Sequence, residues 1–118
     1  MLHETLTRLL RNVKGAEWAM VVGLDGVLLD ACGSPAASCS ETVAAEYALL
    51  YRACQRVVTE TAVGIPQSFA MTTDRSKVLI QTLGPECFLL MSLDSDQPSG
   101  RARFEIARAR VLLERDLV

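Results

Sequence analysis

The sequence predicts an α+β fold in which a five-stranded antiparallel sheet is flanked by helices on both faces. Three stretches repeat apolar residues with helical spacing, and five shorter apolar runs lie between them. The runs form a group of two and a group of three, and the connections inside each group are too short for a parallel crossover. The expected order is therefore α-β-β-α-β-β-β-α. Residues 1–118 suit a single domain, because domains commonly contain roughly 100–150 residues.

An amphipathic helix opens the chain, and a β-hairpin follows it. The apolar stripe of the helix consists of Leu2, Leu6, Leu9, Leu10 and Val13. Two apolar runs at 18–24 and 27–31 then flank Asp25 and Gly26, a pair that favours a two-residue hairpin turn with positive φ angles. Both runs are nearly continuous rather than alternating, so we expect both strands to be buried on both faces.

The middle helix is predicted to follow a loop of small residues at 32–40. Ser38 and Glu41 have the spacing of a capping box, in which each side chain binds the backbone N–H of the other residue. We expect the helix to begin there and to run to about Thr61, because Gly and Pro follow shortly afterwards.

The second half of the chain favours an antiparallel meander followed by a helix. Three apolar runs at 67–73, 77–83 and 87–93 are separated by short turn signals. The buried stripe expected for the last helix consists of Ala102, Ile106, Ala109, Leu113 and Leu117.

Two apolar residues of the last helix lie opposite this stripe. Phe104 and Val111 are placed there among Arg108 and Arg115. They form either an exposed apolar and basic patch for a partner or a contact with the first helix, and the contact is the interpretation we favour.

The middle helix has an apolar face wider than one sheet requires. Its apolar residues cover an arc of roughly 140°, whereas packing on one sheet face needs roughly 100°. The excess runs through Ala44, Ala48 and Tyr51. Small residues would let a second backbone approach closely, and Tyr is favoured at interfaces. The face either lies deep in the core of one chain or packs on its own sheet and on a second copy.

Composition and charge exclude several classes of function. The formal net charge of −2 argues against nucleic-acid binding, which normally leaves a basic footprint. No stretch approaches the ~18 continuous apolar residues of a membrane span, and the N-terminus lacks the pattern of a secretion signal. We therefore expect a cytoplasmic protein without direct membrane insertion. The four cysteines contain no Cys-x-x-Cys pair, so free thiols are expected rather than a zinc site or disulfides.

The sequence offers few residues for catalysis. His3 is the single histidine and lies at a terminus, which disfavours a Ser-His-Asp or Cys-His arrangement. The glycines form no phosphate-binding motif, and the sequence contains no evident cluster of metal ligands. We therefore predict a protein that is not an enzyme and that uses no catalytic residue, metal or cofactor.

Three segments together resemble the roadblock/dynein light-chain family. They are the hairpin at 21–29 (VVGLDGVLL), the Ala-rich middle helix, and the run at 87–93 (CFLLMSL) that leads into an Arg- and Ala-rich final helix. The resemblance covers essentially the whole chain and implies a roadblock-like homodimer, in which the middle helix and the next strand join two sheets into one. It places the dimer interface on Ala44, Tyr47, Ala48, Tyr51, Gln55, Ser68 and Ala70.

The resemblance also implies a partner. Similar bacterial and archaeal proteins bind small Ras-like GTPases and in some cases stimulate GTP hydrolysis. We expect a homodimeric regulator or scaffold that orders the GTPase's own switch elements, since Arg75 is the only isolated loop arginine that could act as an arginine finger. Leu49 lies on the polar side of the middle helix, so the candidate GTPase contacts are Glu46, Leu49, Arg52 and Arg56.

A small-ligand sensor of PAS- or GAF-like architecture is the alternative, because five antiparallel strands with helices also describe those domains. Such a sensor needs an internal cavity. The dense Leu, Val and Ala content of the strands leaves little room for one. A structural dimer without any effect on GTP turnover is a third interpretation.

Overall fold

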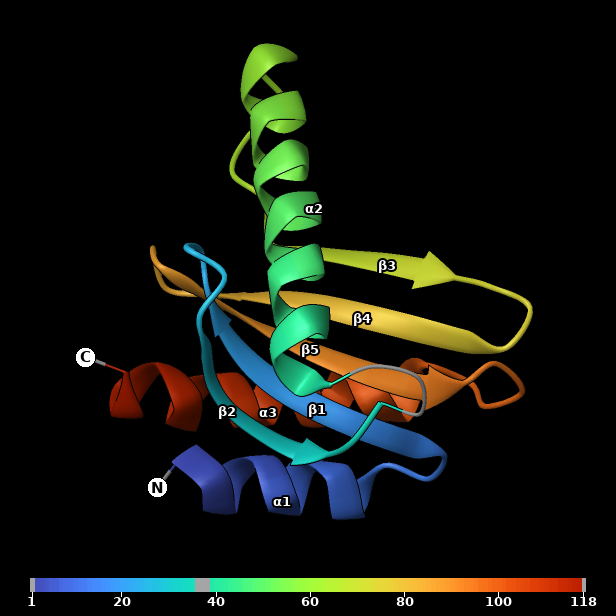
Figure 1. Cartoon of the computed structure of the whole chain (residues 1–118). Coiled ribbons are helices and arrows are strands. Elements are labelled where there is room, and N and C mark those ends of the chain that lie inside the picture. The colour runs from blue at the N-terminus through green and yellow to red at the C-terminus, as the bar shows by residue number, and fades with distance from the viewer. Residues whose placement is uncertain (1, 36–38, 118) are drawn as a thin grey trace.

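The computed structural model describes residues 2–35 and 39–117. It has the predicted order of elements, with the five strands arranged as β2-β1-β5-β4-β3 and every neighbouring pair antiparallel (Figure 1). The elements are α1 (Leu2–Asn12), β1 (Ala16–Gly23), β2 (Leu28–Gly33), α2 (Ser40–Glu60), β3 (Ser68–Thr72), β4 (Ser76–Leu83), β5 (Cys87–Asp94) and α3 (Gly100–Asp116). The predicted fold class is therefore confirmed.

Different helices cover the two faces of the sheet. α1 and α3 lie side by side on one face, and α2 crosses the other face (Figure 1). Side chains alternate between the two sides of a strand, so β5 serves both layers. Its Leu89 and Met91 belong to the core beneath α1 and α3, whereas Phe88 and Leu90 belong to the core beneath α2.

The strand order determines which apolar runs are buried. β1 has a neighbour on each side, and its residues 18–23 are all buried. β2 lies at one edge of the sheet, and its Leu29 is exposed. The prediction of burial on both faces is thus confirmed for the first strand of the hairpin and wrong for the second, because an edge strand has only one strand beside it.

The hairpin turn differs from the predicted two-residue turn. Gly26 has a φ of +89°, but Asp25 is not among the residues with positive φ. The backbone N–H of Gly26 donates to Gly23 O at 2.9 Å, and the N–H of Gly23 donates to Val27 O at 2.9 Å. These bonds define a three-residue loop at 24–26 with a left-handed glycine at its end, which is a common alternative hairpin connection.

α2 begins at Ser40 with Cys39 at its N-cap. Ser38, which was predicted to cap this helix, lies outside the described residues. α2 ends at Glu60, and its C-terminal part projects beyond the edge of the sheet (Figure 1). Residues 52–60 are all half-buried or exposed, so much of the surface of these turns is free.

α3 buries the predicted stripe, although Leu117 at its end is only half-buried. Phe104 and Val111 are 56% and 60% exposed. The favoured interpretation that they contact the first helix is therefore wrong, because α1 lies along another flank of α3, near Ala109 and Leu112.

Candidate functional site

The buried stripe of α2 consists of Ala44, Ala48 and Tyr51, the residues that were expected to extend its apolar face beyond the width one sheet needs. Ala44 and Ala48 are fully buried, and Tyr51 is 2% exposed. Tyr51 stacks on Phe88 of β5 and meets Phe69 of β3 edge-on. These three side chains pack inside their own chain and fix the orientation of α2 on the sheet. Their place in a dimer interface stays a prediction.

Two other predicted interface residues lie at the border of this stripe. Tyr47 is half-buried, and its ring meets Trp18 edge-on with centroids 6.5 Å apart. Burial raises the pKa of the Tyr47 hydroxyl. Gln55, one turn beyond Tyr51, is also half-buried. Both remain within reach of a second chain.

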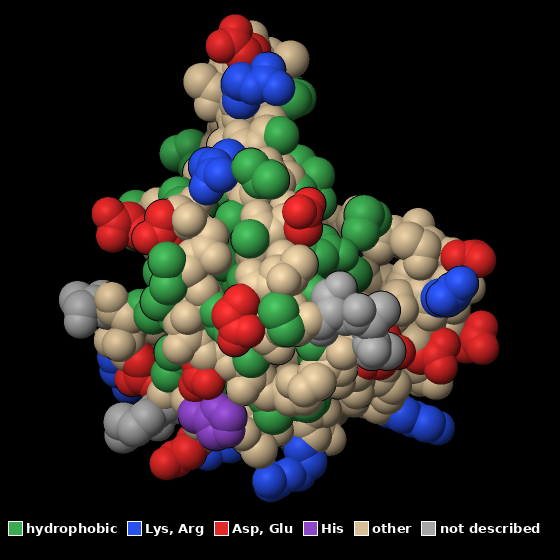
Figure 2. All heavy atoms as spheres, in the orientation of Figure 1, with side chains coloured by type: hydrophobic (Ala, Val, Ile, Leu, Met, Phe, Trp, Pro, Cys, Tyr) green, Lys and Arg blue, Asp and Glu red, His purple; other side chains and the backbone are tan. Residues whose placement is uncertain are grey.

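Exposed apolar side chains lie on the outer flank of α2 and on the segments that follow it. They are Leu50, Val57, Val63, Ile65 and Met71, and we call them the α2–β3 apolar surface. Val57 is 51% exposed, and Ile65 is 83% exposed. Figure 2 shows apolar side chains over the projecting helix and the adjoining part of the sheet. Grouped exposed apolar residues of this kind mark interaction sites.

β3 forms the second edge of the sheet. It pairs with β4, and no strand of the described residues pairs with its other side. Phe69 packs against the core beneath α2, so Phe69 and Met71 share the α2 face of the sheet. The alternate residues Ser68 and Ala70 therefore point to the opposite face. Their backbone groups can contribute to an interface that extends the sheet. The sequence pattern did not show that the backbone of these residues, rather than their side chains, is available for such contacts.

Three of the candidate GTPase contacts, Leu49, Arg52 and Arg56, lie on a neighbouring flank of α2, whereas Glu46 is one turn before Leu50 and borders the α2–β3 apolar surface. Glu46, Leu49, Arg52 and Arg56 are all exposed, as expected for a contact surface. Arg52 also donates from Nη1 to Leu24 O, which ties α2 to the β1–β2 loop. This bond joins residues 28 positions apart, so the helical pattern contained no signal for it.

The described residues contain no group of three or more side chains suited to holding a metal ion. None of the described helices is both long and apolar enough to cross a membrane. His3 Nδ1 lies 3.1 Å from Asp30 Oδ1 on β2, which links α1 to the sheet edge. One hollow of about 650 Å³ lies between the β1–β2 and β4–β5 loops, and it is open to solvent rather than enclosed.

A comparison with protein families identifies the fold. Residues 2–92 match the family model of the Roadblock/LC7 domain. The chain belongs to this family. The Roadblock/LC7 match covers α1 through most of β5 and therefore includes α2 and both edges of the sheet. No curated protein matches the sequence.

Solved structures share the Roadblock/LC7 fold at low sequence identity. MglB of Myxococcus xanthus has a TM-score of 0.91 at 16% identity, covering 98% of this chain and 94% of that one. A Roadblock/LC7 domain of Streptomyces avermitilis has a TM-score of 0.90 at 17% identity, with 98% and 97% covered. A structure described as MglB with tetrameric arrangement has a TM-score of 0.86 at 23% identity, with 95% and 84% covered.

Proposed function

We propose that this Roadblock/LC7 chain forms a homodimer that binds a small Ras-like GTPase in the cytoplasm. The observation that carries the proposal is the projecting end of α2, which presents exposed apolar residues beside the unpaired edge of β3. An exposed strand edge and an exposed apolar helix flank both lose their contact with water when a second copy binds.

The geometry favours a two-fold arrangement of two chains. In such an arrangement the same surface is used by both copies. Antiparallel pairing of two β3 strands would use the free backbone groups of 68–72 and extend the sheet from one chain into the next. Val57 and Leu50 of each α2 would then lie near the partner's helix. Self-association of a similar fold is known from the structure described as MglB with tetrameric arrangement.

The GTPase would bind to the side of α2 that the dimer leaves open. Glu46, Leu49, Arg52 and Arg56 place one apolar residue among three charged ones, which suits a transient contact with a soluble partner. The regulator would act by holding the GTPase's switch elements in an active arrangement, and the GTPase would supply its own catalytic groups.

The dimer is tested with a matched pair of valine variants. Val57→Asp should give monomers at concentrations where the wild type is dimeric, because a carboxylate would be buried in the interface. Val111→Asp, which changes a similarly exposed helical valine on α3, should leave the dimer intact. Sedimentation velocity measures both. A monomeric wild type, or a Val57→Asp dimer of unchanged stability, would contradict the proposal.

GTPase binding is tested by affinity capture from a lysate of the source organism. One sample contains excess GDP and a parallel sample contains a non-hydrolysable GTP analogue. We expect a Ras-like GTPase that is retained mainly with the analogue. Leu49→Asp should abolish this capture without dissociating the dimer, whereas Leu112→Asp on α3 should retain it.

The other outcomes separate the remaining functions. Retention in both nucleotide states would indicate a scaffold that does not distinguish them. If the Leu49→Asp variant captures the GTPase as well as the wild type does, the contact surface lies elsewhere on the chain. If neither nucleotide state retains a GTPase, the proposal fails, and a ligand screen by thermal shift becomes the test of the sensor alternative.

A further inference from the structure

The helical layer formed by α1 and α3 has a charge opposite to that of the whole chain. The two helices contain seven arginines and four carboxylates. The complete chain nevertheless has a formal charge of −2. This layer lies on the face of the sheet opposite α2 (Figure 1), so it is separate from the surfaces assigned to the dimer and the GTPase. A basic layer on an acidic protein indicates a preference for anionic partners.

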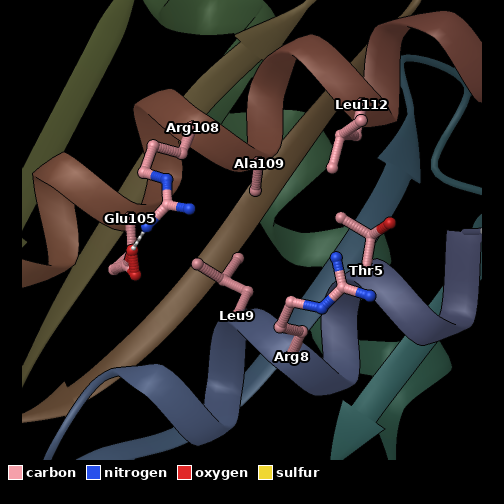
Figure 3. Close-up of a pocket in the computed structure, with 7 residues that line it drawn as sticks. All are labelled: Thr5, Arg8, Leu9, Glu105, Arg108, Ala109 and Leu112. Atoms are coloured by element: carbon pink, nitrogen blue, oxygen red, sulfur yellow. Dashed lines mark hydrogen bonds and ion pairs between the residues drawn. The ribbon is translucent and has the colours of Figure 1, made fainter.

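A groove runs between α1 and α3 within this layer. It has a volume of about 280 Å³, and Leu9, Ala109 and Leu112 provide its apolar lining. Arg8 extends from α1 and Arg108 extends from α3, so a guanidinium group comes from each side of the groove (Figure 3). The combination of an apolar lining and flanking cations suits a ligand that is both apolar and acidic.

The carboxylate in the groove is already paired. Glu105 is only 4% exposed, and it forms ion pairs with Arg108 at 3.0 Å and with Arg101 at 3.6 Å. Its charge is therefore compensated inside α3. Arg8 makes no ion pair within the part of the chain that the structure describes, and the Arg108 side chain is 67% exposed despite its bond to Glu105. Both guanidinium groups retain N–H donors for an incoming carboxylate.

Exposed apolar side chains continue the groove along the outer side of α3. Phe104 lies between two arginines, with Arg101 5.9 Å and Arg108 5.8 Å from the ring centroid. Val111 lies two turns further along the same side, next to Arg115. Basic and apolar residues thus alternate at intervals of three and four, which is the spacing with which one helix meets another.

We propose that the α1–α3 groove binds an acidic amphipathic helix of a partner protein. The apolar side of such a helix would cover Phe104, Val111 and Leu112, and its flanking Asp or Glu residues would pair with Arg8 and Arg108. A peptide fits better than an anionic membrane surface, because the ligand site is a groove and because Glu114 and Asp116 lie on the same helix as the arginines. The sheet separates this site from α2, so both can be occupied together.

The test begins with a display selection. Random peptides of 17 residues, the length of α3, are selected on the full chain. We expect enriched peptides to carry apolar residues at i, i+3 or i+4 and i+7 with Asp or Glu beside them. Fluorescence anisotropy then measures the affinity of the most enriched peptide. Its affinity should fall when NaCl is raised to about 0.5 M, because salt screens exposed charge pairs.

Variants of exposed residues locate the binding site. Arg8→Glu and Phe104→Gln should each weaken the selected peptide by roughly tenfold or more, as expected at the centre of an interface. Arg103→Glu is the matched control, because it makes the same charge change on the opposite flank of α3 and should leave the affinity within roughly twofold. Circular dichroism confirms that the variants fold.

Three results would overturn the proposal. They are a selection without enrichment, enriched peptides without acidic residues, and equal binding to wild type, Arg8→Glu and Phe104→Gln. A parallel co-sedimentation uses vesicles of phosphatidylserine and phosphatidylcholine. If the vesicles bind in a way that Arg8→Glu and Phe104→Gln abolish, and no peptide is enriched, the surface serves a membrane and the peptide assignment is wrong.

Discussion

Tyr51 lies flat against Phe88, with ring centroids 4.6 Å apart and an angle of 5° between the planes. The Tyr51 hydroxyl is 2.6 Å from Thr82 Oγ1, and Thr82 Oγ1 donates to Pro66 O at 3.1 Å. Because the Thr82 proton is used on Pro66, Tyr51 must donate to Thr82. One side chain of α2 thereby connects the helix to β5, to β4 and to the segment that leads into β3.

This network predicts a graded loss of stability. Tyr51→Phe should lower the free energy of unfolding by about 1 kcal/mol, the typical value of one hydrogen bond. Tyr51→Ala should lower it by about 3–5 kcal/mol, because a large buried ring is removed. Tyr47→Phe is the control, since the Tyr47 ring is only half-buried, and it should change the value by less than about 0.5 kcal/mol. Urea unfolding at one protein concentration measures all three. Equal effects of Tyr51→Phe and Tyr47→Phe would contradict the network.

Two glycines with positive φ should respond differently to alanine. Gly33 has a φ of +77°, and a Cβ there would lie 2.6 Å from Glu17 O. Gly84 has a φ of +63°, and apart from its own atoms and those of its two chain neighbours, no atom of the described residues lies within 4 Å of its Cβ position. Both substitutions should cost about 1–2 kcal/mol for the left-handed backbone, and Gly33→Ala should cost about 1–3 kcal/mol more because it collides with β1. Thermal unfolding compares them, and similar melting temperatures would show that the edge strand shifts to make room.

Cys39 should react at lower pH than Cys87. Its Sγ lies 3.0 Å from Thr42 Oγ1, and the hydroxyl and backbone N–H of Thr42 lower the pKa of this exposed thiol. Burial, followed by the charges of Glu86 and Asp25, raises the pKa of Cys87. The thiolate is the reactive form, so Cys39 should be alkylated at lower pH than Cys87.

Thr42→Val provides the control for this assignment. It removes the hydroxyl but keeps the backbone N–H, so the alkylation profile of Cys39 should move to higher pH while that of Cys87 stays in place. Iodoacetamide labelling between about pH 6 and pH 10, followed by peptide mass spectrometry, measures each cysteine separately. A profile of Cys39 that does not move would exclude the Thr42 hydroxyl as the cause.

Arg75 should be dispensable for any stimulation of GTP hydrolysis. It lies in the β3–β4 turn, at the end of the hairpin that points away from α2 (Figure 1). With the captured GTPase, Arg75→Ala should keep single-turnover hydrolysis within about twofold of wild type, whereas loss of an arginine finger typically costs about 10³-fold or more. Arg56→Ala, on the proposed GTPase side of α2, should weaken binding. A loss of several hundredfold with Arg75→Ala would assign Arg75 the catalytic role.

The types and order of the elements could be predicted because their signals are local. The stripe from Leu2 to Val13 and the turn at Asp25 and Gly26 are encoded within a few residues. The length of that turn could not be predicted, because the hydrogen bond from Gly23 N to Val27 O selects a three-residue loop.

The orientation of α2 could not be predicted from the helix itself. Its apolar arc allows several directions, and Tyr51 faces the sheet because Phe88 lies 37 positions later on β5. The edge position of β2 is also set by distant pairing, since β5 occupies the other side of β1. Ala44 and Ala48, two of the residues predicted for the dimer interface, accordingly lie in the core beneath α2.

The arginines of α1 and α3 make the charge distribution of the molecule asymmetric, with a net positive helical layer on one face of the sheet. These two helices contain seven of the twelve basic residues and four of the fourteen acidic residues. The rest of the chain therefore has five basic and ten acidic residues. The resulting dipole would turn an approaching partner before contact and speed the encounter of oppositely charged surfaces at low salt. A dimer with both α2 helices on one side would add the two dipoles, so the order in which partners arrive would depend on ionic strength as well as on affinity.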